Sequence, residues 1–213
     1  INKNSFNSSE LISLLGKFEY VSVELKYSSE TSQIIIQQAS DLKKTLGKKL
    51  RFSAYIEGIS KIGMQFKNNK DLYKVRIGKK VTGISSNAFK GCTSLTKVSI
   101  HYSVTEIGSS AFDECKSLCE ITIPSSITQI SNSCFRCCSS LSEITIPSSV
   151  TSIQSNAFRS CTSLRQITIP SSVNKIGDHA FYGCYSLTQI TIPSSITSIG
   201  NYTFSECSSL SQI

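Results

Sequence analysis

The chain has 213 residues, a formal net charge of +8, 39% hydrophobic residues, nine cysteines and no tryptophan. This length is enough to bury a sizeable core. No run of eighteen apolar residues occurs, so the sequence predicts no membrane-spanning helix. No signal peptide opens the chain, and we expect from Ile1 that the sequence is a mature or excised segment.

The positive charge is concentrated in the first 80 residues. These hold 15 Lys and Arg against 7 Asp and Glu (15 − 7 = +8), whereas residues 81–213 hold 7 of each. A basic block indicates an acidic partner, such as nucleic acid, an anionic glycan or a membrane surface. We favour a solvated face and expect no nucleic acid, because no aromatic residues interleave with the lysines as a nucleic-acid platform requires.

Residues 1–58 follow no repeat and predict an α-β-α-β unit. A capping box over residues 7–10 opens a helix with apolar residues at helical spacing. Val21–Tyr27 alternates as a strand does. Thr31 to Leu46 reads as a second helix stopped by Gly47, and Leu50–Ile56 alternates again.

From residue 59 onward the sequence repeats every 23 residues. Each copy has a phenylalanine, a cysteine three residues later and a leucine six residues later; Asn69 replaces the first cysteine. A fixed period in this range is typical of a solenoid. The phenylalanines are Phe66, Phe89, Phe112, Phe135, Phe158, Phe181 and Phe204, and the cysteines are Cys92, Cys115, Cys138, Cys161, Cys184 and Cys207.

Each position within a copy has a physical interpretation. Leu141, Ile144 and Ile146 have the spacing of a leucine-rich-repeat strand, in which the two isoleucines point to one side. Pro147 removes a backbone donor and ends the strand. The following apolar residues, through Phe158, complete the inside of a coil. One coil cannot bury these side chains alone, so we expect coils to stack about 4.8 Å apart.

The repeat unit reads L-x-x-I-x-I-P-x-S-[IV]-x-x-I-[GSQ]-x-x-A-F-x-x-C from about Ile59 to Ile213. It resembles the BspA-like (Treponema-type) leucine-rich repeat of bacterial and protist surface proteins. The resemblance implies an α/β repeat solenoid with a parallel concave sheet, and a cell-surface or secreted adhesin that binds host matrix or other cells. The first copies depart from the pattern: Gly78 and His101 stand where later copies have Pro124, Pro147, Pro170 and Pro193.

We therefore expect two units, an N-terminal cap over residues 1–58 and a solenoid over residues 59–213. Phe52 and Val75 are 23 residues apart, as are Ala54 and Ile77. This spacing predicts that the second cap strand is the first member of the repeat sheet. Because the last strand stops at Ile213, we expect the solenoid to be truncated there, and self-association through the uncapped end is an alternative.

The cysteines suit packing better than chemistry. Stacked residues have parallel Cβ vectors about 4.8 Å apart, whereas a disulfide needs Cβ atoms at roughly 3.8 Å that face each other. We expect the six repeating cysteines to be free and buried. Cys134 and Cys137 have zinc-like spacing, with Cys115 and Cys119 one copy away, but no histidine completes a site, so we expect no metal. A disulfide at Cys134 or Cys137 is a minority alternative.

Catalysis and cofactors find no support in the sequence. The only two histidines, His101 and His179, occupy different repeat positions, and no nucleophile or carboxylate recurs beside them. Gly-rich phosphate loops are absent. We expect a protein that is not an enzyme and has no cofactor.

The candidate binding residues lie between the buried residues of each strand. They form a row that grades from basic through acidic to neutral polar, along a ladder of threonines. The functional interpretation is a concave surface that recognises a protein; the alternative is that threonine is simply a good strand former. The row is Lys74, Arg76, Lys97, Ser99, Glu120, Thr122, Glu143, Thr145, Gln166, Thr168, Gln189 and Thr191.

Three functions follow in order of preference. The first is a surface adhesin, with which glycosylation sequons at Asn7 and Asn201 are compatible. The second is a cytoplasmic scaffold, which nine mostly unpaired cysteines favour. The third is a binder of an anionic polymer through the basic N-terminal block.

Overall fold

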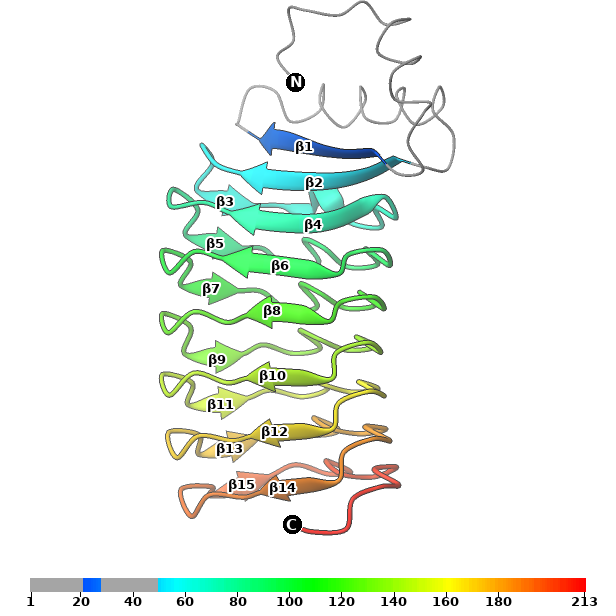
Figure 1. The fold of residues 1–213 in the computed structure, drawn as a ribbon. Helices are drawn as coiled ribbons and strands as arrows, with labels where there is room; N and C mark the ends of the chain where they lie inside the picture. The colour runs from blue at the N-terminus through cyan, green and yellow to red at the C-terminus, as the bar shows by residue number, and fades with distance from the viewer. Residues whose placement is uncertain (1–20, 28–49) are drawn as a thin grey trace, which may run out of the picture.

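The structure, a computed structural model, describes residues 21–27 and 50–213. The helices predicted after Asn7 and over Thr31 to Leu46 lie outside the described residues. The described chain winds through stacked coils of short strands and turns, with a single 3-10 turn, η2 (Met64–Phe66), before the first complete coil (Figure 1).

Each coil gives one strand to a front sheet and a shorter strand to a back sheet, and all strand pairs are parallel. The predicted leucine-rich-repeat solenoid with a parallel sheet is confirmed. The front strands are β1 (Val21–Tyr27), β2 (Leu50–Ile56), β4 (Leu72–Ile77), β6 (Lys97–Ile100), β8 (Glu120–Thr122), β10 (Glu143–Thr145), β12 (Gln166–Thr168) and β14 (Gln189–Thr191). The back strands are β3 (Lys61–Ile62), β5 (Gly83–Ile84), β7 (Glu106–Ile107), β9 (Gln129–Ile130), β11 (Ser152–Ile153), β13 (Lys175–Ile176) and β15 (Ser198–Ile199).

The start of the front sheet differs from the prediction in two ways. β2 does join the repeat sheet, but β1 pairs with it on the other side, so β2 is not the first member. The predicted 23-residue alignment is also wrong, because Ala54 pairs with Val75 and Phe52 with Leu72, across an irregularity next to Phe52. The offset of 21 residues for Ala54 differs from 23 by two, and a shift of two keeps the same side chains facing inward.

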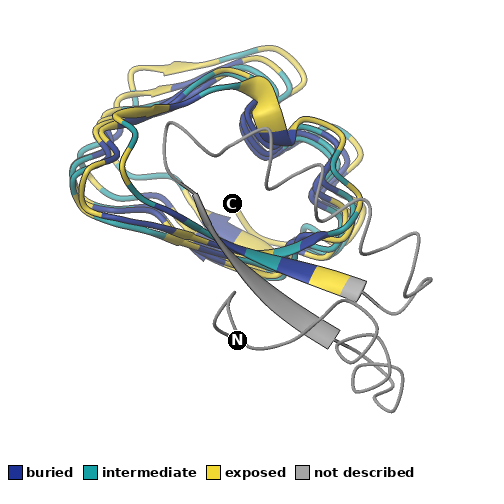
Figure 2. Cartoon of the chain, turned by 90° about the horizontal axis from the view of Figure 1, so that it is seen from above, coloured by how far each residue is buried: buried dark blue, intermediate teal, exposed yellow. Residues whose placement is uncertain are grey.

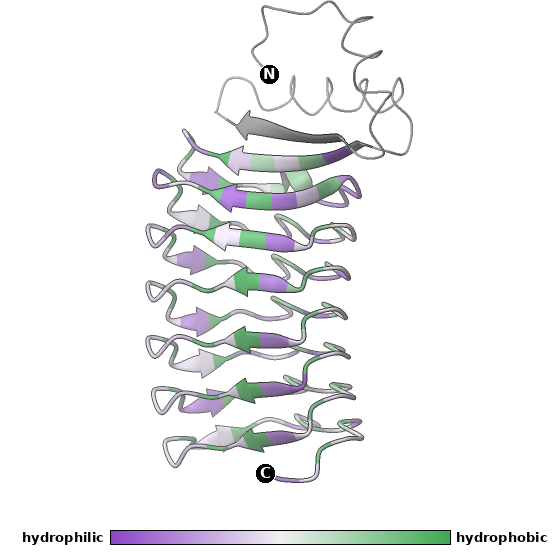
Figure 3. Ribbon diagram, in the orientation of Figure 1, coloured by the Kyte–Doolittle hydropathy of each residue, from purple (hydrophilic) through white to green (hydrophobic). Residues whose placement is uncertain are grey.

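The core is a continuous column of apolar side chains along the axis of the stack. Viewed down that axis, buried residues line the inside of the coils and exposed residues the outside (Figure 2). The front strands alternate accordingly between hydrophobic and hydrophilic residues (Figure 3). Val150, Ile153 and Phe158 are fully buried, as predicted.

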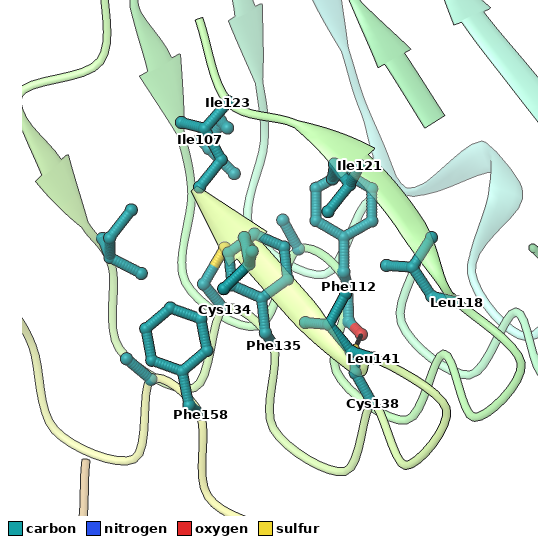
Figure 4. Close-up of a cluster of buried hydrophobic side chains, with 14 of the residues drawn as sticks. Ile107, Phe112, Leu118, Ile121, Ile123, Cys134, Phe135, Cys138, Leu141 and Phe158 are labelled. Carbon is teal, nitrogen blue, oxygen red and sulfur yellow. Dashed lines mark hydrogen bonds between the residues drawn. The ribbon is translucent and has the colours of Figure 1, made fainter. Parts of the chain in front are cut away.

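The phenylalanines form the most regular part of this column. Rings in neighbouring coils stack with centroids 5.3–5.7 Å apart and planes within 16° of parallel. Phe112, Phe135 and Phe158 follow one another in this way between the leucines and isoleucines of the strands (Figure 4). These distances are typical of favourable aromatic pairs.

The repeating cysteines form a second column beside the rings. Each thiol donates a hydrogen bond to the phenylalanine carbonyl of the coil before it, at 3.0–3.2 Å; one example is Cys138 Sγ to Phe112 O at 3.2 Å. All nine cysteines are free, and the six repeating ones are buried, as predicted. Burial raises the pKa of Cys92 to about 12 and the pKa of Cys115 and Cys138 well above the ordinary value. The buried thiols are therefore protonated at neutral pH.

From Phe89 onward, the turns around each phenylalanine use the left-handed backbone region at two residues. In the coil of Phe158 the two residues are Asn156 (φ 59°) and Ser160 (φ 58°), two residues before and two after the ring. These turns direct backbone N–H groups to the next coil, for example Phe158 N–H to Ala180 O at 2.8 Å. The third side of every coil is thus joined to its neighbour by hydrogen bonds.

Within the described residues, no helix has the length and apolar character needed to cross a bilayer.

Candidate recognition surface

The predicted binding residues all lie on the outward side of the front strands. We call this surface the strand face. Each side chain is exposed except that of Lys97, which is half-buried. The parallel register aligns them in columns within each front sheet, and one of these columns reads Thr145, Thr168 and Thr191 from β10 onward.

At its amino end the strand face mixes cations with aromatic rings. The Arg76 guanidinium lies 4.4 Å from the centroid of the Tyr55 ring. Arg51 and Lys74 both lie over Tyr73, at 5.0 and 5.2 Å. The expectation that no aromatic residues interleave with the basic ones is therefore wrong on β2 and β4. Alternation along β2 and β4 places Tyr55 and Arg76 on the outward side of the sheet, and the parallel pairing of the two strands brings them together.

One of the two carboxylates in the row of predicted binding residues is already paired with a lysine. Glu120 forms a salt bridge with Lys97, which is its register partner on the neighbouring strand. Both side chains are partly exposed, and exposed pairs of this kind contribute about 0–1 kcal/mol. Among the described residues no cation pairs with Glu143, which is left as the acidic group of the strand face.

The strand ladders are interrupted on two sides at one level, although on the back the Ser131 hydroxyl still donates to Ile107 O across it at 2.5 Å. The front strands form two sheets, one ending at β8 and the other beginning at β10. The back strands separate in the same way between β7 and β9. Both separations belong to the same gap between coils, so the described strands form no ladder of hydrogen bonds across it on the front or the back.

On the third side the same gap is closed by charge as well as by hydrogen bonds. Arg136 holds the buried carboxylate of Asp113 with two bonds, Nε to Oδ1 at 2.9 Å and Nη2 to Oδ2 at 3.0 Å. Lys90 contacts Asp113 from the coil above at 3.0 Å, and Glu114 contacts Arg136 at 3.3 Å. This paired carboxylate raises the pKa of Arg136. The coils are thus clamped on one side, whereas the strand ladder is interrupted on the strand face.

A groove of about 510 Å³ lies on the strand face across this interruption. The isoleucines at its base, Ile121 and Ile144, are 9% and 7% exposed, against 2% for Val75 on β4. Six of the predicted binding residues line it, namely Glu120, Thr122, Glu143, Thr145, Gln166 and Thr168. The remaining lining residues are Cys119, Ile121, Ile144, Ile146, Ile167 and Pro170. We call this the strand-face groove.

A second groove of about 590 Å³ lies at the carboxyl ends of β2, β4 and β6. The sequence interpretation placed only Arg76 and Ser99 of its lining in the binding row. The signal that could have located it was the missing proline in the first two copies, at Gly78 and His101. Its lining is Tyr55, Glu57, Arg76, Ile77, Gly78, Lys79, Ser99, Ile100 and His101, and we call it the amino-end groove.

The remaining candidates for chemistry stay apart. In the described part of the chain, no three His, Cys, Asp or Glu side chains gather as a metal site would require. Cys134 is buried in the core, and Cys137 is half-buried. His101 contacts Ser103 and packs at a tilt against Tyr102, whereas His179 stacks on Tyr202 on the turn side.

Comparison with known proteins agrees with this architecture. The sequence profile of the family described as BspA type leucine rich repeat region matches six copies, over residues 60–156 and 138–213. This profile is that of a repeat region and not of a catalytic family. A comparison with curated proteins finds no match.

The solved structures that are similar to the chain include two of 30% identity or more. A leucine-rich cell-surface protein from Faecalibacterium prausnitzii A2-165 is 44% identical with a TM-score of 0.66, over 72% of this chain and 42% of that one. A leucine-rich repeat protein of T. pallidum is 30% identical with a TM-score of 0.72, over 78% of this chain and 80% of that one. The chain thus spans less than half the length of the F. prausnitzii protein. Since the family profile covers most of the sequence and the coils have the expected geometry, the chain belongs to the BspA-type leucine-rich repeat family.

Proposed function

We propose that the chain is a protein-recognition module of a cell-surface adhesin, and that its ligand binds the strand-face groove. The observation that carries this proposal is the position of the groove. It lies where the front sheet is interrupted, and it is lined by exposed amide, hydroxyl and carboxylate groups over buried isoleucines. An apolar base with a few polar groups is the usual composition of a binding site. The F. prausnitzii relative, described as a cell-surface protein, supports the location.

The proposal is tested by changing Glu143 to Lys and Thr145 to Arg together. Lys and Arg are the residues that β4 has at the equivalent outward positions, Lys74 and Arg76. The repeat therefore tolerates this pair on a front strand. Beads coated with the full chain should adhere to cultured epithelial cells at least about tenfold less when the groove is altered, because central contacts dominate recognition.

The matched control adds the same three positive charges to the back of the stack. Gln129, Ser152 and Ser198 are changed to Lys, the residue that Lys175 already provides in this column. The control should adhere like the unchanged chain, and circular dichroism checks that both variants are folded. Equal adhesion by the groove variant and the unchanged chain would show that the ligand binds elsewhere.

The second candidate function is a cytoplasmic scaffold that uses the same groove. It is favoured by the nine free cysteines, because reduced thiols are typical of reducing compartments. The hydrogen-bonded, buried positions of the six repeating thiols weaken this argument, since packing alone explains them. Surface labelling of intact cells separates the two locations.

A further inference from the structure

We propose that the amino-end groove binds an acidic saccharide, a sugar unit that carries a sulfate or carboxylate group. This site is separate from the strand-face groove, and its ligand is of a different chemical class from the protein partner proposed above. The proposal rests on the side chains that line the groove, on their departure from the repeat, and on their charge.

The charged residues of this groove, Arg76 and Lys79, are ones that core packing does not require. In four later coils the corresponding positions read Thr-x-Pro-Ser, as at Thr122, Pro124 and Ser125. In the first coil they read Arg76, Gly78 and Lys79. All these coils enclose the same core of isoleucine, leucine and phenylalanine. Because the consensus residues build the coil equally well, the basic set at the amino end needs a reason other than the fold.

The groove is built around Tyr55. A Cβ atom at Gly78 would lie 3.0 Å from the Tyr55 hydroxyl and 3.2 Å from Ile56 O, so the glycine makes room for the ring. The Arg76 guanidinium lies over the ring at 4.4 Å. Gly78 N–H also donates to Ile56 O at 2.8 Å, which fixes the backbone at this point. A cation and an aromatic surface are therefore held side by side at the edge of the sheet.

His101 also lines the groove, and it contacts a second aromatic ring, Tyr102, that lies outside the lining. The His101 ring lies 4.0 Å from the Tyr102 ring, and Tyr102 is 74% exposed. The His101 Nδ1 atom accepts the Ser103 backbone N–H at 3.1 Å, and the Ser103 hydroxyl reaches Val81 O at 2.7 Å. These contacts fix the orientation of the His101 ring, which lines the groove.

The charge and donor pattern fits a sugar better than other anions. Arg76 and Lys79 supply positive charge for a sulfate or carboxylate. Glu57 supplies a hydrogen-bond acceptor, to which a ligand with only anionic groups cannot donate. A saccharide carries both an anionic group and hydroxyl donors, whereas a glutamate side chain carries no donor. Nucleic acid needs a longer track of cations and stacking platforms, and a groove of about 590 Å³ has the size of a small-molecule site.

The test uses the full chain and a fully sulfated heparin tetrasaccharide, with binding measured by calorimetry at physiological salt. The groove variant changes Arg76 to Thr and Lys79 to Ser, which are the residues of the later coils. Exposed charge pairs contribute about 0.2–1 kcal/mol each, so loss of two should weaken binding roughly 2- to 30-fold. A second variant, His101→Pro with Tyr102→Ser, restores the consensus at these two positions and should also weaken binding.

The control removes two lysines elsewhere, by Lys116→Ser and Lys175→Ser, which are again residues found in these columns in other coils. It should bind the tetrasaccharide like the unchanged chain. Equal weakening of the control and the groove variant, or unchanged binding by either groove variant, would overturn the proposal. It would also be overturned if hexaglutamate or a single-stranded oligonucleotide bound as tightly and lost affinity in the same variants, or if the tetrasaccharide did not bind.

Discussion

Replacement of Phe135 by alanine is expected to lower the free energy of unfolding by about 3–5 kcal/mol. The ring is fully buried and stacks on two neighbours, Phe112 at 5.7 Å and Phe158 at 5.5 Å. Its loss leaves a cavity in the middle of the stack and interrupts the contact between adjacent coils. Because a solenoid is held together by such nearest-neighbour contacts, the two halves should also unfold less cooperatively.

Urea unfolding followed by circular dichroism measures both effects, through the midpoint and the slope of the transition. The control is Tyr102→Ser, which removes a ring that is 74% exposed and should change stability by less than about 0.5 kcal/mol. A loss below about 1 kcal/mol for Phe135→Ala would contradict the position of the phenylalanines inside the coils.

Raising the pH from about 8 to about 10 is expected to remove several kcal/mol of stability. Burial raises the pKa of Cys92 to about 12, and raises the pKa of Cys115, Cys138, Cys161 and Cys184 as well. In the unfolded chain these thiols ionise near pH 8.5. A raised folded pKa gives stability that is complete below the unfolded pKa and is lost as the pH rises towards the folded one. Each thiol then costs about 1.4 kcal/mol per pH step, against a total stability of about 5–15 kcal/mol.

Urea midpoints between pH 7 and pH 10 measure this loss. In a variant with Cys138→Ser and Cys161→Ser, the serine hydroxyls can still donate hydrogen bonds to Phe112 O and Phe135 O. Unlike thiols, they do not ionise in this pH range. Above pH 8.5 the slope of stability against pH should be smaller in the variant than in the unchanged chain. The difference should be about 3 kcal/mol per pH unit, the contribution of two thiols. The same pH dependence in both proteins would mean that the thiols are not buried as the structure places them.

The residues that face the inside of the coils could be predicted from the sequence, because the 23-residue repeat and the two-residue alternation of a strand select the same positions. The 23-residue repeat aligns the copies, and the alternation along a strand separates Ile144 and Ile146 from Thr145. The offset of β2 could not be predicted this way. A shift of two residues between Ala54 and Val75 leaves the same side chains inside, so the hydrophobic pattern is identical for the predicted and the observed register.

The interruption of the front sheet between β8 and β10 has no signal in the sequence. Residues 121–124 and residues 144–147 both read Ile-Thr-Ile-Pro, so the copies above and below the gap are alike where the sheet separates. The left-handed turns were missed for a related reason. Asn87 and Asn156 are typical of such turns, but Ser110, His179 and Tyr202 adopt the same conformation at the equivalent position. Hydrogen bonds between coils, rather than local preference, select that backbone.

The function proposed for the strand face is tested most directly by attaching a bulky group to Cys119 in the strand-face groove. Cys119 is exposed and lines the strand-face groove, whereas the repeating thiols are buried and protonated. In a background with Cys137→Ser, a polyethylene-glycol maleimide should therefore react at Cys119 and abolish the adhesion of coated beads to cells. The same treatment of a Cys119→Ser, Cys137→Ser chain should leave adhesion unchanged. Full adhesion by the chain labelled at Cys119 would contradict the assignment of the groove as the recognition site.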